Sequence, residues 1–571
     1  MTKEWLIQKP DVYLLEQIKK KYHCHHITAA ILANRLPSLE DASLFIAPSF
    51  NHLHSPFEIK DIDKAVYRIC LAIQNKEKIL IFGDYDVDGV TSVSVLFEFL
   101  TYAGADVSYY IPHRMEEGYG FKAFHVKKLT EQFDIDLLIT VDCGSKSYDA
   151  VLESNRLGID VIITDHHEAN VVPKAYAVVN PKQPDCHAGF EYLAGVGVVF
   201  CLIICLRKQL RDLNYWQPPY SEPNLKDFCD LVALGTIADI VPLLHDNRIF
   251  VQAGLEVISE GKRPGIQALK NISEIKKPFV DASDIAFKLS PRINAAGRLY
   301  HSDVAVELLT TSCMKKAKQI AATLDDINCQ RRQLENSIYT HIETYLKDHP
   351  NDLKKHSIVL MDQSWHEGVI GIVASRLVDK YHMPVILFSQ NNGIGKGSAR
   401  SIPTVDMHQT LESCCQHIEA FGGHKMAAGL TIQTKQFSAF RDQFDAIVQK
   451  STCHSDFKSV ITIDYLIKFH EISEQLVNEL EKLGPFGSGN QEPIFGAYNI
   501  QVRSANLVGG SHRRMVLSQL DGYSENYLEA IQFNVNPLEE VPHTLYKVAF
   551  KTQWNYWNGK KTIQLLIEEI N

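Results

Sequence analysis

The chain has 571 residues, of which 45% are hydrophobic and 22% are charged, as in ordinary soluble globular proteins, and this length predicts two to four domains. The formal net charge of -10 excludes nucleic-acid binding by bulk charge, so any such binding would need a local basic groove. The 12 cysteines form no CxxC pair and several lie in apolar runs, which indicates buried free thiols and a cytoplasmic location. No signal peptide is recognisable, and the longest apolar run, 193–206, is too short to span a bilayer, so we expect no membrane association.

Residues 1–55 form a predicted N-terminal accessory region, to which we assign no chemistry. Between residues 56 and 245 short apolar runs alternate with helical patterns, which indicates a parallel sheet covered on both faces. Ligands of such sheets bind beyond the carboxyl ends of the strands. We expect the strands at 78–82, 107–112, 136–142, 159–164 and 176–180.

The stretch 78–91 is the centre of this domain. A buried strand is followed by Asp84, Asp86 and Asp88, and Gly89 opens a helix predicted to run from Val90 to Leu100. Crowded carboxylates resist ionising together unless a cation neutralises them, and their oxygens suit Mg²⁺ or Mn²⁺. The alternative is a polar turn in which the aspartates cap the helix.

Other predicted strand ends also carry polar residues. Asp142 ends one strand, Asp165, His166 and His167 end another, and Asp239 follows an apolar run. Each has a structural alternative: a helix cap for Asp142, a structural role for a lone histidine, and a buried turn for Asp239. Because all of them fall at one edge of one sheet, together they predict a metal centre.

The next two regions are a helical connector, 246–348, and a second α/β domain, 349–452. An amphipathic pattern over 317–348 predicts a long connecting helix, although periodicity alone also allows a helix within one continuous domain. Arg292 and Arg298 flank a run of small residues. In the second domain we expect two Gly-rich phosphate-binding loops, one at Gly393–Arg400 and one that contains the set Gly422, Gly423 and His424.

Residues 453–571 read as short strands separated by turns, which predicts a small antiparallel barrel. Such barrels commonly bind single-stranded nucleic acid through aromatic and basic side chains. The alternative is that these aromatics belong to the barrel core. The candidate contacts are Arg513, Arg514, Trp554, Tyr556 and Trp557.

The motifs DYDVDG, VDCG, DHH and GTIADIVPL, in this order, resemble those of the DHH phosphoesterases. IPHRMEEGYG, LSPRINAAGRL, WHEGVIGIVASRL, GKGSARS, FGGHKMAAG and LGPFGSGNQEP resemble the RecJ branch of that superfamily. The resemblance implies an α/β fold with a parallel-sheet DHH domain, a long helical connector, a DHHA1-like second α/β domain and a C-terminal OB-fold barrel. It also implies a 5′→3′ exonuclease, specific for single-stranded DNA, that releases 5′-mononucleotides in recombination and repair.

By this resemblance two divalent ions, Mn²⁺ or Mg²⁺, are bound. Asp142 would bridge them, Asp84 and Asp86 would hold one ion, and Asp88, His166 and Asp239 the other. His167 would face the substrate phosphate and Asp165 would orient the imidazoles. Because a 5′→3′ enzyme must recognise the 5′ end, we expect a terminal-phosphate pocket walled by Arg114, Arg298, Ser398 and Arg400. The complete set expected to bind substrate is Arg114, Arg292, Arg298, Ser398, Arg400, Gly422, Gly423 and His424.

The partners implied by the resemblance are single-stranded DNA, a single-strand-binding protein and a helicase. Two other functions fit parts of the pattern. One is a phosphodiesterase of short oligoribonucleotides or cyclic dinucleotides, although such relatives lack the barrel and the long connector. The other is a non-catalytic replication scaffold, although such proteins tend to lose the ligands that are present here.

Overall fold

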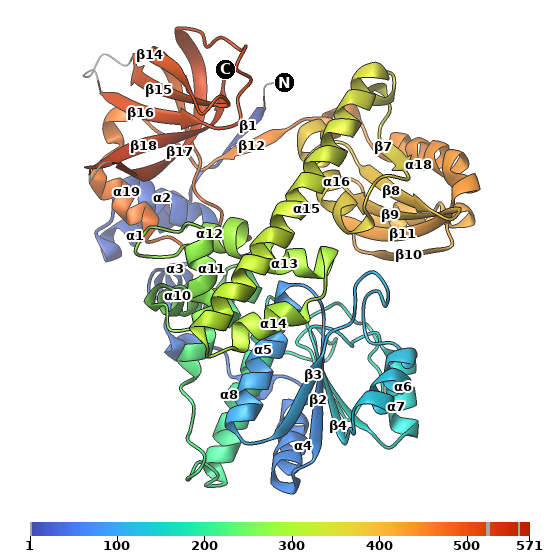
Figure 1. Ribbon diagram of the computed structural model, residues 1–571. Helices are drawn as coiled ribbons and strands as arrows, with labels where there is room; N and C mark the ends of the chain where they lie inside the picture. Colours follow the sequence, from blue (N-terminus) through green and yellow to red (C-terminus); the bar gives the residue numbers. More distant parts are fainter. Residues whose placement is uncertain (1–2, 521–525, 558–559) are drawn as a thin grey trace.

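The computed structural model describes residues 3–520, 526–557 and 560–571, and it does not describe the side chains of residues 454, 455 and 557. Figure 1 shows two α/β lobes joined by one long helix, with a β-barrel beside them. Both ends of the chain lie at the barrel. The predicted fold class is confirmed.

The first lobe is built on a parallel sheet of order β3-β2-β4-β5-β6. Alternate residues of β2 face opposite sides: Ile79 and Ile81 join one hydrophobic core, while Leu80 and Phe82 join another. Helices α4, α5 and α8 pack on the first side, and α6 and α7 on the second. The strands are β2 (Lys78–Gly83), β3 (Asp106–Tyr110), β4 (Leu137–Val141), β5 (Asp160–Thr164) and β6 (Ala177–Val179). The helices are α4 (Ile62–Asn75), α5 (Val87–Tyr102), α6 (Ala123–Gln132), α7 (Tyr148–Arg156) and α8 (Gly195–Asp212).

The helices that follow the sheet extend the same core, which continues as far as Leu324. The first part of α15 packs there, whereas Ile338, Ile342 and Leu346 pack in the second lobe. With 35 residues, α15 is about 50 Å long, which is long enough to reach from one lobe to the other. Of the predicted connector, 246–348, helix α15 is the element that crosses between the lobes (Figure 1). The helices are α9 (Cys229–Ala238), α10 (His245–Glu260), α11 (Pro264–Ile272), α12 (Ala282–Asp284), α13 (Ser290–Leu299), α14 (Asp303–Thr310) and α15 (Met314–Asp348).

The second lobe has a mixed sheet of order β10-β11-β9-β8-β7. The segment predicted as the first Gly-rich loop is strand β9, so that prediction is wrong. Its glycines serve packing, because a Cβ on Gly397 would lie 2.5 Å from the Phe388 ring. The elements are β7 (Ile358–Asp362), β8 (Val385–Asn391), β9 (Ile394–Arg400), β10 (Ala420–Gly423), β11 (Ala427–Gln433), α16 (Glu367–Tyr381), α17 (Met407–Glu412) and α18 (Phe437–Ser451).

The C-terminal barrel runs in the order β13-β14-β15-β16-β18-β17 and closes because β14 also pairs with β17. The first helices of the chain share its core, so the predicted accessory region packs with the barrel. Strand β1 also pairs in parallel with β12. The strands are β1 (Glu4–Ile7), β12 (Val460–Ile463), β13 (Tyr465–Leu466), β14 (Phe495–Val508), β15 (His512–Gln519), β16 (Tyr527–Gln532), β17 (Thr544–Trp557) and β18 (Lys560–Ile570). The helices are α1 (Val12–Tyr22), α2 (His26–Arg35), α3 (Leu39–Ile46) and α19 (Glu474–Glu481).

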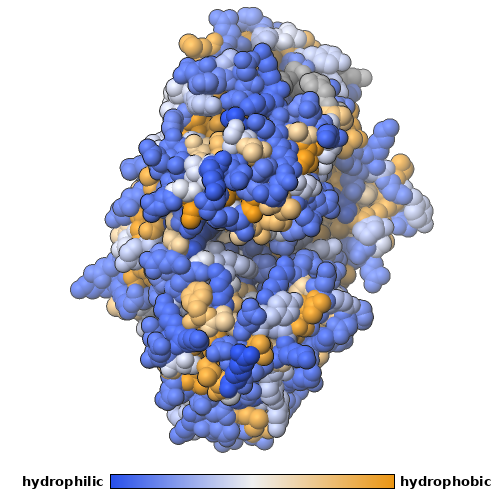
Figure 2. All heavy atoms as spheres, turned by 90° about the vertical axis from the view of Figure 1, so that its right-hand side faces the viewer, coloured by the Kyte–Doolittle hydropathy of each residue, from blue (hydrophilic) through white to orange (hydrophobic). Residues whose placement is uncertain are grey.

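Among the described residues, no helix combines the length and the apolar character needed to cross a membrane. Figure 2 looks onto the side where the second lobe lies above the first, and hydrophilic residues dominate this face. Apolar residues appear on it as small separate patches.

Candidate active site

Three strands of the first lobe end at the same edge of the sheet, and each delivers acidic residues there. Asp84 follows β2, Asp142 follows β4, and Asp165 follows β5. Helix α5 begins earlier than predicted, at Val87, because Asp86 caps it by accepting a hydrogen bond from the Gly89 amide. All three strand-end carboxylates are buried.

The imidazole of His166 lies among three carboxylates. Its Nε2 is 3.3 Å from Asp142 Oδ1, 3.6 Å from Asp239 Oδ2 and 3.8 Å from Asp88 Oδ2. Three groups of possible metal ligands share members here: Asp84, Asp86 and Asp142; Asp88, His166 and Asp239; Asp142, His166 and His167. The structure therefore brings all the predicted metal ligands together.

The protein itself only partly offsets the negative charge of these carboxylates. Burial, with repulsion from neighbouring aspartates, raises the pKa of Asp88 to about 7 and that of Asp239 to about 8. The same causes raise the pKa values of Asp84 and Asp142 well above their usual range. Asp84 Oδ1 and Asp142 Oδ1 are buried and accept no hydrogen bond from any described residue. Buried oxygens without donors, next to an imidazole nitrogen, fit divalent cations.

The start of helix α8 positions two of these aspartates, which sequence reasoning missed. The amides of Gly195 and Val196 donate to the Asp88 carboxylate, at 2.6 and 2.9 Å. A Cβ on Gly195 would lie 2.6 Å from Asp142 Oδ1. Glycine at this position is thus the residue that leaves room for Asp142. The only signal in the sequence is a glycine that opens a long apolar helix.

Asp165 lies behind the two histidines and holds His167. It accepts hydrogen bonds from the backbone amides of Ser145, His166 and His167, and from His167 Nδ1 at 2.7 Å. Burial lowers the pKa of His167, but the hydrogen bond and negative charge of Asp165 outweigh it and raise that pKa to about 9. The other ring nitrogen, Nε2, lies 3.2 Å from the hydroxyl of Tyr119. Asp165 therefore fixes the His167 ring and favours its protonated form.

Three arginines from both lobes gather beside the acidic cluster. The Arg114 guanidinium lies 5.0 Å from the ring centre of Tyr85, between Asp84 and Asp86 in the chain. Burial, with repulsion from Arg114, Arg331 and Arg400, lowers the pKa of Arg298 to about 9. Neither Arg114, Arg298 nor Arg400 forms an ion pair with any acidic residue that the structure describes.

Hydrogen bonds hold this arginine cluster in place. Arg400 donates through Nη1 to Ser398 Oγ (3.2 Å) and through Nε to Ser375 Oγ (3.1 Å), while Arg298 donates to the Gly368 carbonyl at 3.0 Å. Half-buried cations that lie close together, with no acidic partner among the described residues, indicate an anion site. Arg292, which was also expected to bind substrate, instead forms an ion pair with Asp325 at 2.8 Å.

Glu117 fixes the loop that carries Arg114 and Tyr119, and sequence reasoning did not single it out. Its carboxylate accepts hydrogen bonds from the Tyr110 hydroxyl (2.8 Å), the His113 amide (3.2 Å) and Lys128 Nζ (3.2 Å). The buried imidazole of His125 lies 3.1 Å from the same carboxylate. The loop is therefore tied to strand β3 and helix α6 at a single point.

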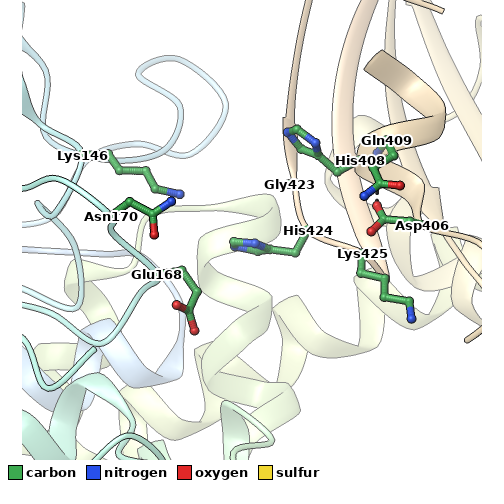
Figure 3. A pocket seen from close by; sticks show the side chains of 9 residues that line it. All are labelled: Lys146, Glu168, Asn170, Asp406, His408, Gln409, Gly423, His424 and Lys425. Carbon is green, nitrogen blue, oxygen red and sulfur yellow. Dashed lines mark hydrogen bonds between the residues drawn. The ribbon is translucent and has the colours of Figure 1, made fainter. Parts of the chain in front are cut away.

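A cavity of about 370 Å³ lies where the lobes face each other. Figure 3 shows Lys146, Glu168 and Asn170 of the first lobe opposite His408, His424 and Lys425 of the second. Gly423 also lines it. Gly422 and Gly423 both belong to strand β10, so the prediction of a second Gly-rich loop is wrong for these glycines, and only His424 lies in the turn that follows. Glu168 directly follows His167, and Lys146 lies four residues after Asp142, so this cavity adjoins the acidic cluster.

The structure contradicts part of the predicted barrel surface. Arg513 is buried and bonded to Gln532, and Trp554 is in the core and donates to Asn478 Oδ1 at 3.0 Å. Arg514 is ion-paired with Glu529 at 2.8 Å, while Tyr556 is exposed. The side chain of Trp557 lies outside the described residues. Core packing of the barrel thus accounts for Trp554, as the alternative interpretation allowed.

Three family models match the chain: the DHH family N-terminal domain over residues 78–236, the DHHA1 domain over 354–450 and the RecJ OB domain over 463–569. The single-stranded-DNA-specific exonuclease RecJ of Haemophilus influenzae is 36% identical over 534 residues, 90% of this chain and 91% of the relative. Crystal structures of Thermus thermophilus RecJ with Mn²⁺ and with Mg²⁺ superpose with TM-scores of 0.84 and 0.77, at 28% and 27% identity. They cover all of this chain and 79% and 78% of theirs. The chain belongs to the RecJ family of single-stranded-DNA-specific exonucleases.

Proposed function

We propose that this protein digests single-stranded DNA from the 5′ end and releases 5′-mononucleotides by two-metal-ion hydrolysis. The observation that carries the proposal is the cluster of Arg114, Arg298 and Arg400, which have no acidic partner in the described part of the chain, beside overlapping groups of metal ligands. An anion site next to a metal centre gives the enzyme a means of recognising a terminal phosphate.

In this proposal Asp84, Asp86 and Asp142 hold one ion, and Asp88, His166 and Asp239 hold the second. Asp142 is the proposed bridge, supported by its membership of two ligand groups and its 3.3 Å distance from His166. The ions would activate a water molecule for attack on phosphorus and neutralise charge on the phosphate oxygens. The Mn²⁺ and Mg²⁺ complexes of the Thermus thermophilus relative support this choice of ions.

His167 would donate a hydrogen bond to the scissile phosphate. Asp165 favours its protonated form and orients its ring, because the Nδ1 hydrogen bond turns Nε2 away from Asp165 and toward the hydroxyl of Tyr119. A protonated imidazole stabilises the extra negative charge that develops on phosphate oxygens during displacement.

The proposed pocket of Arg114, Arg298, Ser398 and Arg400 would hold the 5′-phosphate of the first nucleotide. The next phosphate along the strand would then lie at the acidic cluster. Cleavage on the 3′ side of the first nucleotide would release a 5′-mononucleotide and leave a new 5′-phosphate on the shortened strand. Each product would therefore be a substrate of the same kind.

The strand beyond the scissile phosphate would run through the cavity between the lobes, where Gly423 and His424 lie (Figure 3). The barrel would then guide single-stranded DNA toward this entrance. We further propose, on family resemblance, that a helicase supplies the strand, that a single-strand-binding protein delivers it, and that the process serves recombination and repair.

The test is digestion of 5′- and 3′-labelled single strands and of blunt duplexes, with Mn²⁺ or Mg²⁺. The proposal expects mononucleotides from the 5′ label at once, late loss of the 3′ label, and little digestion of the duplex. Cleavage rates on a matched set of RNA di- and trinucleotides distinguish the exonuclease from the alternative, a phosphodiesterase of short oligoribonucleotides. Faster cleavage of these than of long DNA, or no cleavage of any substrate, would contradict the proposal.

A further inference from the structure

We infer that a loop of the C-terminal domain, residues 484–492, holds the turn that carries Asp239 and thereby sets the geometry of one metal site. We call this segment the docking loop. The inference rests on the metal-ion function proposed above, and it assigns to the barrel domain a positioning task in addition to contact with DNA.

The turn after Asp239 has a strained backbone. Helix α9 ends at Ala238. Ile240, the residue that follows Asp239, has a φ of +61°. A β-branched residue in the left-handed region is strained and persists only where the surroundings fix it. The Ile240 side chain is 74% exposed, so its own packing does not supply that support.

The docking loop supplies support from outside the first lobe. The Leu243 amide donates to the Ser488 carbonyl at 2.8 Å. A Cβ on Gly489 would lie 3.0 Å from Pro242 Cβ, and a Cβ on Gly487 would lie 2.7 Å from Leu243 Cδ1. The two glycines therefore allow the loop to press directly against the turn, three to four residues after Asp239.

The docking loop is itself rigidly held. Asn490 is only 1% exposed, its Nδ2 donates to two backbone carbonyls at 2.9 Å each, and its Oδ1 accepts from Arg35 Nη1 at 2.8 Å. On the other side of the turn, Arg248 of α10 donates through Nη2 to the Gly484 carbonyl at 2.7 Å. Segments near residues 35, 245 and 487 thus lock together around the turn.

The effect should be confined to one ion. Asp239 belongs to the ligand group with Asp88 and His166, and not to the group of Asp84, Asp86 and Asp142. A displaced turn would move the Asp239 carboxylate, which lies 3.6 Å from His166 Nε2, while leaving the strand ends that carry the other group unchanged. If the loop only stabilised the fold, a change in it would affect metal binding at both sites equally.

The test compares Gly489→Ala with Gly158→Ala in the full-length protein. Both glycines have positive φ, +72° and +75°, so backbone strain is matched. A Cβ at Gly158 meets nothing within 4 Å, whereas one at Gly489 meets the turn. Mn²⁺ titration followed by electron paramagnetic resonance counts the bound ions and gives an affinity for each, independently of catalysis.

We expect two Mn²⁺ sites in the wild type and in Gly158→Ala, and in Gly489→Ala a loss of about tenfold in affinity at one site alone. Unchanged affinities in Gly489→Ala, or equal losses in both variants, would overturn the inference. Circular dichroism checks folding, and if Gly489→Ala does not fold, Gly487→Ala, which has no positive φ, carries the same expectation. A wild type that binds no Mn²⁺ would refute the proposed metal function instead.

Discussion

Replacing Arg400 with alanine should remove most of the preference for 5′-phosphate over 5′-hydroxyl ends. Nε and Nη1 of Arg400 are used by Ser375, Ser398 and the Ala399 carbonyl, whereas Nη2 donates to no acceptor in the described part of the chain. Nη2 is therefore the part of the guanidinium available to a phosphate. A hydrogen bond to a charged group contributes about 1.5–3 kcal/mol, which corresponds to a loss of about 10- to 150-fold.

The assay is the ratio of kcat/KM for 5′-phosphorylated and 5′-hydroxyl strands of the same sequence. Arg376→Ala is the matched control, because Arg376 lies in the same lobe but is ion-paired with Glu335 at 2.9 Å. If Arg400→Ala weakens both substrates equally, the residue is a general backbone contact and the terminal-phosphate pocket is wrong.

Thermal unfolding gives an independent check on the same variant. Burial and repulsion from Arg114 lower the pKa of Arg400, so its charge is unfavourable in the free protein. Without ligand, Arg400→Ala relieves this repulsion but also loses the hydrogen bonds to Ser375 and Ser398, so the quantity to compare is the gain in Tm on binding 5′-mononucleotide. That gain should be smaller in Arg400→Ala than in the wild type. An equal gain in the two proteins would contradict the anion-site interpretation.

Four further predictions follow from the site and from the packing of the barrel. Asp142→Ala should abolish cleavage while leaving circular dichroism unchanged, because it removes the proposed bridging carboxylate; appreciable activity in the purified, folded variant would refute that role. Glu117→Gln should loosen the Arg114 loop, raising KM for 5′-phosphorylated strands without changing Mn²⁺ affinity, and a changed Mn²⁺ affinity would argue against a role limited to that loop. The folded pKa values of about 7 for Asp88 and 8 for Asp239 lie above the unfolded value of about 4. Metal-free protein should therefore lose stability as pH rises from 5 to 8, and the gain in Tm from Mn²⁺ should grow over the same range; a pH-independent gain would contradict these shifts. Removal of residues 453–571 should weaken binding of long single strands and should also lower stability, because α1–α3 lose the core that they share with the barrel; a stable 1–452 protein of unchanged affinity would exclude both effects.

The first lobe could be predicted closely because its signals are local. Buried parallel strands are continuous apolar runs, so the segments around Ile79, Leu137 and Val161 were recognisable as strands. The carboxyl ends of such strands meet at one edge, so the clustering of Asp84, Asp142 and Asp165 also followed from the sequence. Helix α5 begins three residues before the predicted Val90 because Asp86 is its cap, and an aspartate in an acidic run can be either ligand or cap.

Errors arose where one residue type has two physical uses. Glycines in the segment 393–400 suggest a loop, but a strand that lies against the ring of Phe388 needs glycine equally. Trp554 and Arg513 suggested a DNA-binding surface, but both side chains are buried in the barrel. Composition cannot separate these uses, because the difference lies in which neighbour the fold brings within contact.

Contacts between distant segments are not visible in the sequence, which shows a glycine but not the residue that it contacts. Gly195 makes room for Asp142 across 53 positions, and Gly489 presses on Pro242 from another domain. A metal site of this kind needs its ligands held closely, because like charges at short range push one another apart until the cations bind. The ligands come from strand ends that any parallel sheet brings together. The supports that hold them come from wherever the chain folds back, and here this includes the C-terminal barrel domain. Loss of that domain should therefore disturb the chemistry as well as DNA binding, with the site that contains Asp239 affected first.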